Sequence, residues 1–157
     1  MRTFVVVLAT AVAIGASGCG ATRTTTLQTP AVPTLASATA TFVSTDHGKD
    51  ADSALTVQLL RSNAELGAEI RTVGTKFDDN ASSGPFAFSM AGSFTKSDID
   101  AGQLRLRLTP DGDDDWTFNL HLTMRFSDGS TRNFMWRSVR LDHRSPERVL
   151  TLDPART

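Results

Sequence analysis

The chain has 157 residues, a formal net charge of −1, three histidines and a single cysteine. This near-neutral balance, with no basic stripe, argues against a nucleic-acid partner, and one cysteine excludes an internal disulfide. The length is enough for one domain with its own hydrophobic core.

The N-terminus has the form of an export signal. Arg2 supplies a positive charge, and an apolar run from Phe4 to Ile14 follows it. The run has the length of a signal-peptide core and is shorter than the ~20 apolar residues that a membrane-spanning helix needs. We therefore predict that residues 1–18 are a signal peptide.

Cys19 ends this segment, and Ala16-Ser17-Gly18-Cys19 resembles the lipobox of bacterial lipoproteins, although Ala16 stands where that family usually has Leu. The resemblance implies lipidation of Cys19, cleavage just before it, and an anchor on the extracytoplasmic side of the cell membrane. Two acyl chains would make that anchor stable. The alternative is an ordinary secretory signal followed by a chance cysteine.

A tether is expected next. The residues from 20 to 40 are mostly Thr, Ala and Pro, and Arg23 is their single charge. Such a composition cannot build a core. We therefore predict a disordered tether over 19–37 and a folded domain over 38–157.

The folded part has the pattern of β-strands. Every even-numbered position from 116 to 126 is apolar, and the odd-numbered positions between them are polar. This alternation predicts a half-buried antiparallel strand. The turn Ser127–Ser130 predicts a hairpin, and a change of parity after it predicts a bulge near Arg137–Ser138.

These patterns predict an all-β, antiparallel sandwich of about eight strands. The segment 65–73 also fits a short helix. The expected strands are 38–45, 54–60, 65–73, 84–91, 102–109, 116–126, 131–141 and 147–153.

Aspartates gather in alternate connections between these strands. If every connection reverses the chain, the first, third and fifth emerge at the same end of the sandwich. Calcium is the natural partner of such carboxylates because it takes roughly six to eight oxygen ligands. Solvated turns, in which Asp is a common residue, are the alternative. The candidate metal ligands are Asp46, Asp50, Asp52, Asp78, Asp79, Asp111, Asp113, Asp114 and Asp115.

This arrangement is similar to that of C2 and PLAT-type domains, which are eight-stranded sandwiches with aspartates in the loops at one end. The resemblance covers residues 38–153 and implies a membrane-docking or ligand-docking module. An architecture of this kind hosts many functions.

The sequence therefore predicts a non-enzymatic, lipid-anchored binding protein with an acidic, calcium-binding loop tip and a protein, lipid or glycan ligand. The alternative is an accessory envelope lipoprotein that binds a protein partner through an exposed sheet edge without metal. No catalytic motif supports a hydrolase. We expect Trp116 and Trp136 to lie in the core and His121 to lie on a polar strand face.

Overall fold

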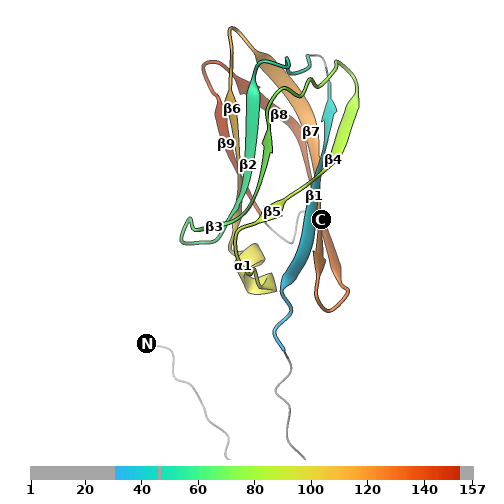
Figure 1. Ribbon diagram of the computed structural model, residues 1–157, viewed down its shortest axis with the longest axis vertical. Helices are drawn as coiled ribbons and strands as arrows, with labels where there is room; N and C mark the ends of the chain where they lie inside the picture. The colour runs from blue at the N-terminus through green and yellow to red at the C-terminus, as the bar shows by residue number, and fades with distance from the viewer. Residues whose placement is uncertain (1–30, 46, 153–157) are drawn as a thin grey trace, which may run out of the picture. The chain divides into compact units, whose positions relative to one another are not determined.

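The computed structural model of the protein describes residues 31–45 and 47–152, and within them the predicted all-β sandwich is confirmed (Figure 1). Nine strands form two antiparallel sheets in this part of the chain. They are β1 (Leu35–Ser44), β2 (Ala54–Leu60), β3 (Leu66–Thr72), β4 (Ser82–Ala87), β5 (Ser89–Met90), β6 (Gln103–Thr109), β7 (Asp115–Phe126), β8 (Thr131–Asp142) and β9 (Glu147–Thr151).

The two sheets pack their apolar faces against each other. One sheet has the strand order β4-β1-β7-β8, and the other has the order β5-β3-β2-β6-β9. Burial alternates along β7 as the sequence pattern predicts, and Trp116, Phe118 and Leu120 are fully buried. Leu104 and Leu106 of β6 complete the core from the opposite sheet. Trp136 of β8 is also buried, so both tryptophans belong to the core as expected.

Two of the predicted strands differ most from the observed ones, and the other observed strands begin and end within two residues of the predicted positions. β1 begins at Leu35 rather than at 38, because Leu35 is buried and its backbone N–H donates to the Phe94 carbonyl at 2.6 Å. The predicted strand 84–91 is two strands. β4 pairs with β1 and β5 pairs with β3, so the chain passes from one sheet to the other at the buried Phe88. Residues 65–73 contain the strand β3 and not a helix.

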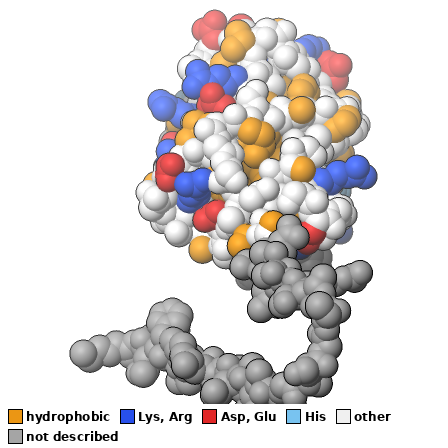
Figure 2. Space-filling view, turned by 60° about the horizontal axis from the view of Figure 1, so that its bottom comes forward, with side chains coloured by type: hydrophobic (Ala, Val, Ile, Leu, Met, Phe, Trp, Pro, Cys, Tyr) orange, Lys and Arg blue, Asp and Glu red, His pale blue; other side chains and the backbone are white. Residues whose placement is uncertain are grey.

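One short helix, α1 (Lys96–Asp100), was not predicted. Thr95 caps it, and a capping box joins Thr95 to Asp98. The helix is tied to the β7–β8 hairpin by Lys96–Asp128 at 2.6 Å and by an ion pair between Arg132 and Asp100. Acidic and basic side chains are accordingly interspersed on this side of the domain (Figure 2). No helix among the described residues is long and apolar enough to cross a membrane.

β1 gives the domain two distinct ends. The strand starts beside α1, where Thr34 bridges to Thr95, and it finishes at Ser44 among the acidic connections (Figure 1). We call these the α1 end and the acidic end. The described chain therefore enters the sandwich at the end opposite to the acidic connections.

Candidate functional site

The acidic end is built from the connections 45–53, 73–81, 110–114 and 143–146, and hydrogen bonds join them. Lys49 and Phe77 exchange two backbone hydrogen bonds, each of 2.9 Å. The Asp111 N–H donates to Ser53 Oγ at 2.9 Å, and the His143 N–H donates to the Asp114 carbonyl at 3.1 Å. The acidic connections therefore lie together, although they are far apart in the sequence.

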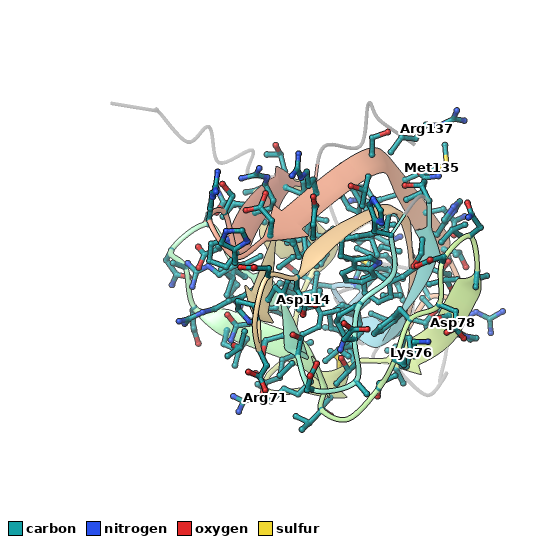
Figure 3. All side chains as sticks on the ribbon, turned by 90° about the horizontal axis from the view of Figure 1, so that it is seen from above. Arg71, Lys76, Asp78, Asp114, Met135 and Arg137 are labelled. Carbon is teal, nitrogen blue, oxygen red and sulfur yellow. The ribbon has the colours of Figure 1, made fainter. Side chains whose placement is uncertain are left out.

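Four of the nine predicted ligands have side-chain partners within the protein. Asp79 accepts a hydrogen bond from the Gly48 N–H at 2.6 Å, and Asp78 pairs with Lys76 at 2.9 Å. Asp115 forms an ion pair with Arg140 at 2.7 Å, and Asp114 accepts a hydrogen bond from the Ser53 hydroxyl. Figure 3 shows Lys76 and Asp78 at the rim of the domain, away from Asp114.

The remaining candidates are solvent-exposed or lie outside the described residues. Asp50, Asp52, Asp111 and Asp113 are exposed, and Asp46 is outside the described part. An open hollow of about 420 Å³ collects part of the set. Its lining is His47, Gly48, Asp50, Asp111, Asp113, Asp114 and Asp115.

Lys49 places a cationic side chain under these carboxylates. It is fully buried, and its Nζ donates to the Asp50 carbonyl at 2.6 Å and to the Ser53 carbonyl. Nζ also lies 5.5 Å from the centre of the Phe77 ring. Burial lowers the pKa of Lys49, while the charges of Asp114, Asp52 and Asp50 act in the opposite direction. The acidic end thus contains a buried lysine whose side chain hydrogen-bonds to two carbonyls of its own loop. The sequence pattern did not predict this role of Lys49.

The geometry of the acidic end bears on metal binding. Among residues 31–45 and 47–152, no three His, Cys, Asp or Glu side chains are grouped closely enough to hold a metal ion. Two of the carboxylates that line the hollow, Asp114 and Asp115, are already bound to partners within the protein. A cation that used either of them would have to displace that partner or share the carboxylate with it.

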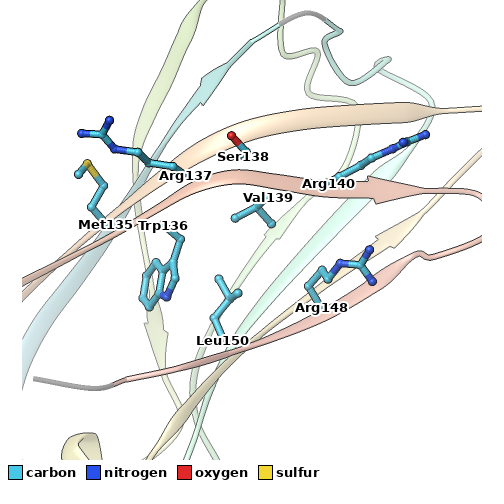
Figure 4. Close-up of a pocket in the computed structure, with 8 residues that line it drawn as sticks. All are labelled: Met135, Trp136, Arg137, Ser138, Val139, Arg140, Arg148 and Leu150. Carbon is cyan, nitrogen blue, oxygen red and sulfur yellow. The ribbon is translucent and has the colours of Figure 1, made fainter. Parts of the chain in front are cut away.

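A second feature lies along the side of the sandwich, where the two sheets end. β8 is the last strand of one sheet and β9 is the last strand of the other. Between them is a groove of about 430 Å³, which we call the trough (Figure 4). It is lined by Met135, Trp136, Arg137, Ser138, Val139, Arg140, Arg148 and Leu150.

The floor of the trough is the edge of the hydrophobic core. Trp136 lies opposite Leu120 on the neighbouring strand, and Leu150 lies opposite Leu104. Directly opposed residues share one face of a sheet, and both partners are fully buried. Trp136 and Val139 are each 7% exposed and Leu150 is half-buried, so the core is incompletely covered here.

The rim of the trough is basic. Arg137, Arg140 and Arg148 all line it, and no acidic residue does. Arg140 is engaged by Asp115 and by Asp142, at 2.7 and 3.3 Å. Within the part of the chain that the structure describes, no carboxylate lies within 4.0 Å of Arg137 or Arg148.

The predicted bulge is confirmed, and it shapes this rim. Phe118 pairs with Val139 and Leu120 pairs with Trp136, so Asn119 alone faces both Arg137 and Ser138. Ser138 has a φ of 53°, and its N–H donates to Asn119 Oδ1 at 3.0 Å. As a result Arg137 and Ser138 are both exposed. Bulges commonly re-aim a side chain in this way.

The chain matches no protein-family model, and no curated protein is significantly similar to it. Cys19 lies outside the described residues. The three histidines are exposed, His121 among them as expected, and in the described part of the chain no hydrogen bond joins a histidine to a serine or carboxylate side chain. The trough combines an apolar floor with a basic rim, an arrangement that can bind through charge and apolar contact.

Proposed function

We propose that this protein is a lipid-anchored, extracytoplasmic binding protein without catalytic activity, and that it holds a protein partner against the exposed sheet edges along the trough. The anchor follows from Cys19 and the signal-like segment before it. The partner follows from the trough, where partly exposed core residues lie beside arginines that have no carboxylate within reach in the described chain.

The trough carries this proposal because two features coincide there. Large apolar side chains that are not fully covered favour contact with another molecule. Free strand edges offer backbone hydrogen-bonding groups to an added segment.

The anchor is tested by Cys19→Ser. We expect the variant to leave the membrane fraction or to accumulate unprocessed, because the only thiol that can accept a lipid is gone. Fractionation of cells that express the parent and the variant at equal levels measures this. A variant that still fractionates with membranes as the parent does would rule out lipidation at Cys19.

The partner is tested by site-specific photo-crosslinking in intact cells. A photoreactive amino acid replaces Met135 at the trough. The matched control places it at Met90 on β5, because the two methionines are similarly exposed, at 42% for Met135 and 39% for Met90. We expect a discrete protein adduct at position 135 and none at position 90. Adducts of equal yield at both positions, or none at position 135, would contradict a protein partner at the trough.

Calcium binding at the acidic end is a second candidate, and it is favoured by the hollow that Asp50, Asp111 and Asp113 help to line. The buried Lys49 and the internal partners of Asp79, Asp114 and Asp115 weigh against it. We therefore place the metal-free function first.

Melting in calcium, in magnesium and in chelator tests this candidate. A cation that binds only the folded state stabilises it by about 2.7 kcal/mol at 100 times its dissociation constant. Such a shift should disappear when Asp50→Asn is combined with Asp113→Asn. Equal melting temperatures in all three solutions would leave these residues as solvated turns.

A further inference from the structure

The positive charge on the rim of the trough indicates the chemistry of a partner that would bind there. Arg61, Arg71, Arg105 and Arg132 each have a carboxylate partner on the domain surface. Arg137 and Arg148 have none among the described residues, and neither do the exposed Arg107, Arg125 and Arg144. Of these five arginines, Arg137 and Arg148 are the two that flank the trough floor, which is made of Trp136, Val139 and Leu150. A guanidinium presents donors in a planar fork that matches a carboxylate. A ligand that complements the trough would therefore carry carboxylates for the two arginines beside apolar groups for the floor.

The position of Arg148 strengthens this argument. It lies opposite Leu106, which is fully buried, so it stands on the core-facing side of β9. A charge on that face is unfavourable unless it reaches water or a partner. Arg148 remains exposed because the trough opens beside it. Its guanidinium therefore borders the same space as the apolar floor (Figure 4).

The shape of the trough favours an extended ligand. The floor and rim lie between two free strand edges, and an extended segment can place alternate side chains on opposite sides. One set would cover Trp136 and Leu150, while the other would reach the arginines. The bulge at Ser138 and the inward-facing Arg148 are also devices that protect a free edge from indiscriminate pairing. A second copy of this chain would bring the same arginines and be repelled.

We propose that the trough binds an extended, acidic segment of a partner protein, with Arg137 and Arg148 pairing with its carboxylates and its apolar side chains covering Trp136, Val139 and Leu150. This inference rests on the proposed function and adds the chemistry of the partner. The arginines make the site selective, because a neutral or basic strand leaves them unpaired or repels them.

The test uses the full chain and a fluorescent peptide of about six residues, the common length of a strand, that alternates Glu with Val. Peptides with Gln or Lys in place of Glu are the ligand controls. Anisotropy measures affinity, and a change in tryptophan emission reports occupation of the floor, because Trp136 lines the trough and the other tryptophan, Trp116, is fully buried in the core. We expect the Glu peptide to bind with a change in tryptophan emission, and the two control peptides to bind at least about tenfold more weakly.

The protein variants separate the trough from general charge attraction. The double variant Arg137→Gln, Arg148→Gln should weaken binding of the Glu peptide roughly tenfold or more, since two charge-assisted contacts are lost. The matched control is Arg107→Gln with Arg125→Gln. Both of its arginines are exposed and outside the trough, and its change in net charge is the same. This control should bind within about twofold of the parent, and all of these proteins should melt alike.

Several results would overturn the inference. Equal weakening by both double variants would show that only net charge matters. Equal binding of the Glu and Gln peptides would show that the trough does not distinguish acidic from neutral side chains. If anionic phospholipid vesicles bind through Arg137 and Arg148 while the Glu peptide does not, the trough is a membrane contact. No peptide binding, with the adduct at position 135 intact, would reject the acidic segment and leave the proposed function standing.

Discussion

The acidic end and the trough are both rich in charge of one sign, yet they differ in how that charge is matched. At the acidic end the carboxylates receive donors from the protein itself, such as the Gly48 N–H, the Ser53 hydroxyl and Arg140, and Lys49 lies beneath them. In the trough, Arg137 and Arg148 have no such partner in the described chain, and the floor beside them is apolar. The two regions therefore differ in how far the described chain itself supplies partners for their charges, and not only in the sign of those charges.

The largest expected effect comes from a residue that both regions share. Phe118 stacks on Trp116 with ring centres 4.0 Å apart, and it lies opposite Val139, which forms part of the trough floor. Phe118→Ala should therefore destabilise the protein by about 3–5 kcal/mol, as large-to-small core changes do. Chemical denaturation measures this loss. A cost below ~1 kcal/mol would mean that the two regions do not rest on one core.

Lys49→Met removes the internal cation of the acidic end and keeps a side chain of similar size. The buried carbonyl of Ser53 and the partly buried carbonyl of Asp50 then lose their donor. We expect a loss of about 1–3 kcal/mol, which is the usual range for unpaired buried polar groups. The control is Lys76→Met, because Lys76 is exposed and pairs only with Asp78.

A full-stability Lys49→Met variant would show that the acidic end needs no internal donor, and it would weaken the comparison. The variant also sharpens the calcium question. With the lysine gone, the carboxylates lack their internal cation, so any stabilisation by calcium should be greater in the variant than in the parent.

The smallest effect concerns acid. Hydrogen bonds from Lys96 and Ser130 lower the pKa of Asp128, hydrogen bonds from Thr95 lower that of Asp98, and backbone N–H groups of Ser145 and Arg144 lower that of Asp142, all from an ordinary value of 3.8. Because the folded-state pKa lies below the unfolded one, this stability is present above pH 3.8 and is lost as the pH falls through the lowered values.

Two of these three groups lie at the α1 end, so the acid response should arise mainly there rather than at the acidic end. Melting between about pH 5 and pH 2 measures it. Asp128→Asn should flatten the loss of stability in that range. An unchanged loss in this variant would contradict the assignment of the acid response to the α1 end.

Much of the fold could be predicted because the sequence alternates with a period of two. The hairpin at Ser127–Ser130 and the bulge at Arg137–Ser138 were local signals, and the structure contains both. The passage from β4 to β5 left no such signal, since Phe88 continues the apolar pattern of a single strand. The capping box from Thr95 to Asp98 was a readable sign of α1, but five residues give too little helical periodicity to detect.

The candidate sites were less predictable, for different reasons. Counting connections was enough to predict that the acidic connections lie at one end. The burial of Lys49 was not predictable in this way, because it depends on Phe77 in another connection and on Ser53, four residues further along its own. The trough depends on which strands end each sheet. β8 and β9 are neighbours in sequence, and alternation alone does not show that they belong to different sheets.

The central place of β1 has a mechanical consequence. The strand has β4 on one side and β7 on the other, and it runs from the α1 end to the acidic end. A pull between the N-terminal side and Asp113 would act along β1 in shear, so many hydrogen bonds would share the load. A pull between the two chain ends would peel β9, an edge strand paired only with β6. Single-molecule stretching should therefore require more force in the first geometry, and equal forces would contradict this.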